Sequence, residues 1–296
     1  MDLNLWKGIS DFVAIDKYPT LPCPHCNQHS LILDRDSIQT RVAPEKVLLD
    51  ANRKYRGEKQ KQQQSSQKNL ETIRKSNGTW LPVIAAVFSV YQDSVAAING
   101  TPFLFSGFFK CSECKHHVSA TGIYLKPAKG LGDVEKTPYI KVDNFSPTVP
   151  IFPLSSNTPK VIGEELFDAF KHFHFDPPSS ASKLRRAIEK FCDDMQVDGS
   201  NLNRKVQNLA KTHPEEAAYL EPLKLVGNEG THGSNVEELD LLYAFQMFQF
   251  VLELYDRKAR FESLQETYDK LANKVGRERL QLTHKKEQVV EAIETD

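Results

Sequence analysis

Four of the five cysteines form two C-x-x-C pairs, Cys23 with Cys26 and Cys111 with Cys114. Two intervening residues let both sulfurs of a pair, and the backbone amides beneath them, turn toward one ion. Four thiolates complete the tetrahedral shell of a structural Zn²⁺ and leave no open position for catalysis. We therefore expect a structural zinc site made of both pairs.

Other interpretations of these cysteines stay open. A redox pair or free thiols would need no metal, although neither pair stands before a predicted helix as a thioredoxin-like pair does. The gap of 84 residues (27–110) exceeds the roughly 15–20 of a compact zinc ribbon. A mixed ligand set would draw on His25, His29, His116 or His117. Cys192 lies on an apolar helix face, which predicts an inert core thiol.

The N-terminal half must position these pairs, and its sequence predicts β-structure. Residues 79–125 are rich in β-branched and aromatic residues around a turn at Asn99-Gly100, and LILDRD (31–36) predicts one short strand. Six prolines between 127 and 160 forbid a regular helix or a central strand and indicate a linker. We predict a zinc-ribbon-like domain over 1–150, with a helical insertion at about 44–76, and a second domain over 151–296.

The second domain has a helical period. Apolar residues recur on one face of 179–195, and further helices are predicted at 163–173 and 201–211. A long helix begins near a capping box of Ser234 and Glu237, and its interior over 239–255 is apolar nearly all round. Beyond Asp256 the sequence is charged, which predicts a segment that projects or pairs with another chain.

The charge distribution restricts how the protein binds nucleic acid. The chain has 38 Lys and Arg against 39 Asp and Glu, a net charge of −1, so bulk charge cannot hold a polyanion. Residues 51–75 concentrate eight cations and two acids, and we predict phosphate contacts there and on the helix over 179–195. A solvated helical arm is the alternative. The predicted nucleic-acid-binding residues are Arg53, Lys54, Arg56, Lys59, Lys61, Arg185 and Arg186.

The helical half carries a family resemblance. The run ASKLRRAIEKFCDDM (181–195), the helix over 201–211 and LKLVGNEGTH, which ends at His232, resemble the bacterial family called domain of unknown function 4145. That family has an A-x-x-L-R-R-A-L-E-x-x-C helix before a G-N-x-x-x-H segment, and often a zinc ribbon in front. The resemblance covers about residues 161–256. It implies a HEPN-like helical bundle, which often dimerises, and a superfamily that includes RNases of toxin–antitoxin and phage-defence systems.

The resemblance also implies catalytic candidates. HEPN RNases use an R-N-x-x-x-H motif, in which a cation stabilises the phosphate and the histidine transfers a proton. Here Asn228 and His232 match, but Gly227 occupies the arginine position, a loss on the order of 10²–10³ in rate. Lys224, Arg185 or Arg186 would have to supply the charge. Alternatively, the glycines make tight backbone, Asn228 caps a helix and His232 bonds to a carbonyl.

We therefore predict an α+β protein with a β-rich zinc-ribbon-like N-terminal domain followed by an all-α HEPN-like bundle. The predicted function is a non-catalytic recognition module that binds nucleic acid or a protein partner, as a homodimer, in a bacterial phage-defence or restriction-type system. The alternatives are a metal-independent RNase using His232 and an assembly subunit whose C-terminal helix docks a partner. An acidic second residue and the lack of a long apolar run predict a cytoplasmic protein without signal peptide or membrane span.

Overall fold

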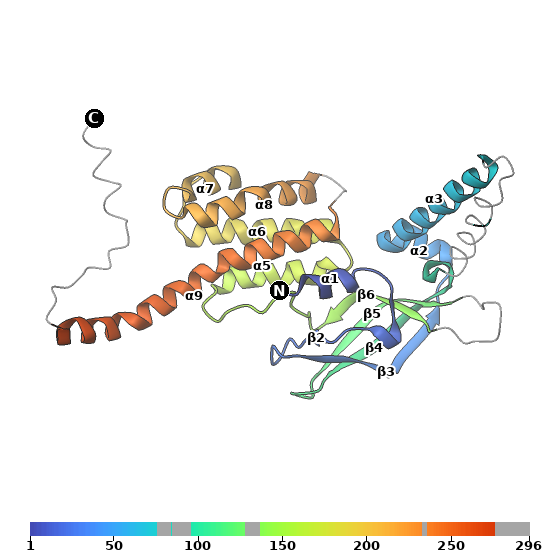
Figure 1. Cartoon of the computed structure of the whole chain (residues 1–296), viewed down its shortest axis with the longest axis horizontal. Coiled ribbons are helices and arrows are strands. Elements are labelled where there is room, and N and C mark those ends of the chain that lie inside the picture. The colour runs from blue at the N-terminus through green and yellow to red at the C-terminus, as the bar shows by residue number, and fades with distance from the viewer. Residues whose placement is uncertain (76–83, 85–95, 128–136, 233–235, 276–296) are drawn as a thin grey trace.

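The computed structural model describes residues 1–75, 84, 96–127, 137–232 and 236–275 (Figure 1). This part of the chain has an α+β architecture in which a curled antiparallel sheet and a group of helices lie side by side. The predicted fold class is confirmed at this level. No described helix combines the length and apolar character needed to cross a lipid bilayer.

The sheet has six strands in the order β1-β6-β5-β4-β3-β2, and neighbouring strands are antiparallel. Side chains alternate along β4, so that Phe105 and Phe109 face the core while Ser106 and Phe108 face solvent. The strand bounds are β1 Val13–Ala14, β2 Leu21–Pro22, β3 His29–Val42, β4 Thr101–Cys111, β5 His117–Lys126 and β6 Tyr139–Ser146.

The structure lengthens one predicted strand and overturns the prediction of a linker. The short strand expected at 31–36 is β3, which runs from His29 to Val42 because it follows β4 through a register shift between Asp34 and Gln39. The segment expected to be a proline linker contains β6, an internal strand of the sheet. Pro138 and Pro147 flank β6, so their missing N–H groups fall outside the ladder. The first part of the β-structure predicted over 79–125, residues 79–95, lies, apart from residue 84, outside the described residues.

The predicted helical insertion over 44–76 is confirmed as two helices, α2 (Glu45–Ala51) and α3 (Arg53–Lys75). Tyr55 and Leu48 pack with Ile123 and Leu125 of β5 in a small second core. This core holds the base of α3 against the sheet. A short helix, α1 (Leu3–Ile9), and two 3₁₀ turns, η1 (Ile15–Lys17) and η2 (Ala97–Asn99), complete this half.

The second half is helical, as predicted. Asp176 caps α6 by accepting a hydrogen bond from the Ser179 N–H, and Pro177 stands at the first helical position. The apolar face of α6 is buried, and α9 passes through the centre with Phe245 and Phe248 fully buried. The helices are α5 Lys160–Phe173, α6 Pro177–Asp194, α7 Leu202–Leu209, α8 Pro214–His232 and α9 Glu238–Val275.

One buried cluster continues from the sheet into the helices, so the predicted domains 1–150 and 151–296 share a core. Aromatic rings mark the route: Phe109 contacts Phe145 of β6, which contacts His174 at the end of α5, which contacts Trp6 of α1. The N-terminal amino group also donates a hydrogen bond to Gln249 of α9 over 3.0 Å. The sheet and its cysteine turns are therefore attached firmly to the bundle.

Candidate functional site

The four paired cysteines lie at one end of the sheet, in two turns that strand pairing brings together. Cys23 follows β2 and Cys26 precedes β3, while Cys111 ends β4 and Cys114 precedes β5. The β3–β4 ladder places Leu31 opposite Cys111. Antiparallel pairing thus closes the long sequence gap, and the intervening chain leaves the sheet as α2 and α3.

The two turns have the same backbone design. The N–H of Cys23 donates to the carbonyl of Gln28 over 2.8 Å, and the N–H of Cys111 donates to that of His116 over 2.9 Å. The residue after each second cysteine adopts a left-handed conformation, with φ of 58° at Asn27 and 64° at Lys115. Non-glycine residues rarely adopt this conformation, so its repetition indicates two equivalent knuckles.

The sulfur positions fit a tetrahedral ion. The Sγ atoms of Cys23 and Cys114 are 3.6 Å apart, those of Cys26 and Cys111 are 3.7 Å apart, and all four lie within 4.8 Å of one another. A thiolate–zinc bond of about 2.3 Å requires sulfurs about 3.8 Å apart at the corners of a tetrahedron. The cluster is therefore geometrically compatible with a metal ion.

Hydrogen bonds favour the thiolate form of Cys111. Burial raises the pKa of Cys111, but the Ser30 hydroxyl at 3.0 Å and backbone N–H groups, among them that of Cys114 at 3.3 Å, lower it overall. The pKa of Cys114 is raised: the backbone N–H of His116 lowers it, but burial and the neighbouring sulfurs outweigh that effect. Four adjacent thiolates repel one another, and a bound cation would relieve that repulsion.

The histidines near the knuckles are not brought into the cluster. Among the described residues, the close group of metal-binding side chains at this end of the sheet contains the four cysteines only. His25 and His116 instead stack on each other, with ring centroids 4.2 Å apart, and His117 contacts the Phe108 ring. The geometry thus favours four cysteines over the mixed ligand set. Cys192 is buried in α6, as predicted, and burial raises its pKa to about 11.

The predicted nucleic-acid-binding residues of α3 lie beside acidic residues. Lys54 contacts Asp11 at 2.8 Å and Glu238 at 3.1 Å, so this one ammonium group joins α3 to the chain after α1 and to α9. Lys59 pairs with Glu45 at 2.8 Å. The other predicted nucleic-acid-binding residues of α3 also have partners. Lys61 pairs with Glu58, the Arg56 guanidinium donates to the carbonyl of Asp50, and Arg53 also has an interaction partner.

The two arginines of α6 are also ion-paired. Arg185 contacts Glu189 at 3.1 Å, one turn further along the helix. Arg186 contacts Glu165 of α5 at 2.6 Å. Nucleic-acid binding by these residues and by α3 stays a prediction, and a phosphate would have to displace carboxylates.

The G-N-x-x-x-H segment is helical. Because α8 continues to His232, the tight backbone considered for Gly227 and Gly230 is wrong, and Asn228 lies one turn before His232. The side chains of this segment lie outside what the structure describes, as does Ser234 of the predicted capping box. The catalytic roles of Asn228 and His232 therefore stay predictions.

A cavity of about 410 Å³ lies where α1, α3, α9 and the α5–α6 turn meet. Its wall includes Lys54, Glu238 and His174. His174 is 5% exposed, and neither ring nitrogen has a hydrogen-bond partner in the described structure. Burial, and then the positive charge of Lys141, hold the pKa of His174 well below its usual value. The His174 ring packs against three aromatic rings, those of Trp6, Phe145 and Phe173.

The backbone carbonyl of His174 contacts a buried lysine, Lys141, which the sequence analysis did not identify. Lys141 of β6 is 1% exposed, and its Nζ donates to the carbonyls of His174 at 2.9 Å and Val142 at 3.0 Å. Burial raises the pKa of the adjacent Asp143 to about 6, although Lys141 and a hydrogen bond from Asn52 oppose the shift. The sequence signal for this group was the pair of charged residues, Lys141 and Asp143, between the apolar residues of β6.

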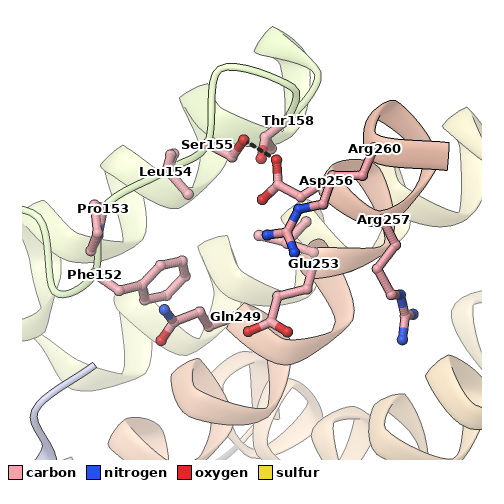
Figure 2. Close-up of a pocket in the computed structure, with 11 residues that line it drawn as sticks. Phe152, Pro153, Leu154, Ser155, Thr158, Gln249, Glu253, Asp256, Arg257 and Arg260 are labelled. Atoms are coloured by element: carbon pink, nitrogen blue, oxygen red, sulfur yellow. Dashed lines mark hydrogen bonds between the residues drawn. The ribbon is translucent and has the colours of Figure 1, made fainter. Parts of the chain in front are cut away.

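A second cavity, of about 320 Å³, lies between the 152–158 segment and α9 (Figure 2). Asp256 accepts hydrogen bonds from the Ser155 hydroxyl and, over 2.7 Å, from the Asn157 amide. These hydrogen bonds lower the pKa of Asp256. Arg257, which also lines this cavity, pairs with the buried Glu216 of α8. These contacts of Asp256 and Arg257 hold this turn of α9 against the 155–157 segment and α8.

Comparison with known proteins supports the family resemblance for the helical half. Residues 167–286 match the family model described as Domain of unknown function (DUF4145). The match begins within α5 and extends past the end of the predicted resemblance. The chain has no significant match among curated proteins or among solved structures.

Proposed function

We propose that this protein is a zinc-containing, non-catalytic recognition module that binds nucleic acid or a protein partner. The observation that carries the proposal is the group of four converging cysteine sulfurs. An all-sulfur tetrahedral shell favours zinc, and four protein ligands leave the ion no position for water or substrate. The ion then stabilises the turns at the end of the sheet and takes no part in chemistry.

The recognition surface that we propose is the exposed face of β3, β4 and β5 beside the knuckles. Ile32, Lys110 and His117 are cross-strand neighbours on this face. Phe108, two residues before Lys110, lies on the same face and is 47% exposed. An exposed ring beside a cation is the combination on which single-stranded nucleic acid stacks. This face supplies an exposed aromatic ring, whereas Tyr55 of the basic α3 segment is buried.

Fluorescence anisotropy of labelled single-stranded RNA and DNA tests this proposal with the zinc-loaded chain. Loss of one stacking ring in Phe108→Ala should weaken binding roughly 5- to 150-fold. Ser106→Ala is the matched control, because Ser106 is exposed on the same face of the same strand but carries no ring. An unchanged affinity in Phe108→Ala would exclude this face, and no binding at low salt would leave only the protein-partner form of the proposal.

The metal-independent RNase remains the second candidate. It is favoured by the position of Asn228 and His232 on consecutive turns at the end of α8, four residues before Val236, which lines the larger cavity. That cavity is also lined by Arg53 and Lys54, cations that could replace the missing arginine of the motif. RNA cleavage that survives EDTA and is lost in His232→Ala would establish it. A role in phage defence or restriction rests on the family resemblance alone.

A further inference from the structure

One side of β3 lies at an open edge of the sheet. On that side, β2 pairs only with His29 and Leu31 at the knuckle end of β3 (Figure 1). Beyond the register shift, residues 39–42 pair with β4 alone, and all four of these residues are exposed. Among the described strands, none borders this part of β3 on its other side. Residues 39–42 therefore form an open edge strand.

The contacts of β4 show which of its backbone groups point toward β3. The N–H of Phe108 donates to the Ser37 hydroxyl over 2.8 Å, and the N–H of Ser112 donates to the Ser30 carbonyl over 2.8 Å. Backbone groups of successive residues point to opposite sides of a strand, and β4 pairs with β5 without a register shift. The even-numbered residues of β4 therefore direct their N–H and C=O groups toward β3.

The register of the ladder then assigns the backbone groups of β3. Ser106 and Leu104 are even-numbered residues of β4, and they lie opposite Gln39 and Arg41. In an antiparallel ladder, two opposite residues whose groups point toward each other exchange both of their hydrogen bonds. Gln39 and Arg41 are therefore the residues at this end of β3 that bond to β4.

The alternate residues, Thr40 and Val42, direct their backbone groups to the open edge. Each offers one N–H and one C=O there. In the part of the chain that the structure describes, no other residue bonds to these groups. The chemical complement of such an edge is an extended peptide, because its own N–H and C=O groups repeat at the same interval.

The side chains along the edge specify the sequence of that peptide. Val42 is 76% exposed and shares the core-facing side of the sheet with its partner Phe103. Arg41 lies on the solvent-facing side, opposite Leu104, and has no ion-pair partner among the described residues. A peptide that alternates apolar and acidic residues would place apolar side chains beside Val42 and carboxylates beside Arg41.

We propose that residues 39–42 of β3 bind an extended segment of a partner protein, which adds a strand to the sheet and alternates apolar with acidic residues. The hydrogen bonds of Thr40 and Val42 hold the backbone of this segment, and Arg41 selects its charge. The site lies at the end of β3 that is remote from the knuckle face, and it uses none of the residues proposed to contact nucleic acid. Either proposal can therefore fail without the other.

Fluorescence anisotropy tests the site with a labelled eight-residue peptide that alternates valine and glutamate, titrated with the full chain. Thr40→Pro should weaken binding at least about 10-fold, because it removes one edge N–H and places the proline ring where the peptide backbone would lie. The matched control is Thr40→Val, which keeps the N–H and should bind as the wild type does. Phe108→Ala should also leave this affinity unchanged.

A second peptide, which alternates valine and lysine, tests the role of Arg41. The wild type should bind it more weakly than the glutamate peptide. Arg41→Glu should weaken binding of the glutamate peptide roughly 2- to 30-fold and strengthen binding of the lysine peptide, because an exposed attraction becomes a repulsion.

Urea unfolding of two proline variants tests the assignment of the backbone groups. Thr40→Pro should keep the wild-type midpoint, because proline is tolerated on an edge strand where its missing N–H would face solvent. Gln39→Pro should lower the midpoint, because it removes an N–H that bonds to β4.

Any of four results would contradict the proposal. The first is a wild type that binds neither peptide at about 1 mM, the weakest affinity that would matter here. The second is an unchanged affinity in Thr40→Pro. The third is a Thr40→Pro variant that does not fold, which would show that the chain itself uses this N–H. The fourth is a wild-type dimer in sedimentation equilibrium that Thr40→Pro dissociates, which would show that a second copy occupies the edge.

Discussion

Removal of the first knuckle should destabilise the protein by a predictable amount. A metal ion held by Cys26 and Cys111 acts as a cross-link between residues 85 positions apart. The chain-entropy relation for a closed loop of that length gives about 4.5 kcal/mol of stabilisation through the unfolded state. A typical domain unfolds with about 5–15 kcal/mol, so this one cross-link is a large part of the total. Replacing Cys23 and Cys26 together by Ser should therefore lower the free energy of unfolding by about that amount.

The assay combines metal analysis with urea unfolding under reducing conditions. We expect one zinc per wild-type chain and none in the double variant. The control is Cys192→Ala, which removes a buried thiol far from the cluster and should keep the full zinc content while losing only about 1 kcal/mol from its small cavity. Chelation of the wild type should reproduce the double variant's unfolding midpoint.

Two results would refute the reasoning. If the double variant retains one zinc per chain, other residues bind the ion and the four-cysteine assignment is wrong. If the zinc is lost but the midpoint stays at the wild-type value, the ion does not act as a cross-link between the sheet turns. The second result would leave the metal site in place and remove its structural role.

Further predictions concern packing and pH. Gly122→Ala should cost at least about 2 kcal/mol, because its Cβ would lie 2.1 Å from the Lys141 carbonyl oxygen, and a urea titration measures this loss. Gly57→Ala in α3 should instead stabilise by about 0.5–1 kcal/mol in the same titration, because nothing lies within 4 Å of the added methyl group. Because burial holds the pKa of His174 below the usual histidine value of about 6.5, the unfolded chain binds the additional proton and stability should fall as pH drops below about 6.5. His174→Phe should lack this loss in unfolding midpoints measured between about pH 7.5 and 5.5, and an equal loss in both proteins would assign it to other groups.

Local patterns were sufficient to predict the paired cysteine turns, the helical insertion and the helices α5, α6, α7 and α9, but α1 and α8 were not predicted. The C-x-x-C spacing identified the four cysteines that lie close together, and the helical period identified α5, α6 and α7 with their buried faces. The prolines around β6 misled because proline excludes a strand only where its N–H is needed, and Pro138 and Pro147 stand just outside the ladder. The number of prolines in a segment does not show whether each proline lies inside a strand or just outside it.

The charge of α3 could not be interpreted from its own sequence for a different reason. Besides the local Glu58, Lys54 contacts Asp11 and Glu238, which lie more than 40 and 180 positions away along the chain. A local count of charges includes neither. For the same reason the sequence could not reveal that Lys141 and His174 share a buried site, because their contact joins β6 to the end of α5.

The ion pairs of Lys54 make any polyanion binding at α3 an exchange reaction. A phosphate that reaches Lys54 replaces two carboxylates already in place, so part of the favourable contact is spent on separating α3 from Asp11 and Glu238. Added salt screens the internal pairs and the external one together, so the dependence of affinity on salt should be shallower than the +6 charge of this segment implies. By reciprocity, a ligand bound there would loosen the attachment of α3 to α9, and a change at either site would be felt at the other.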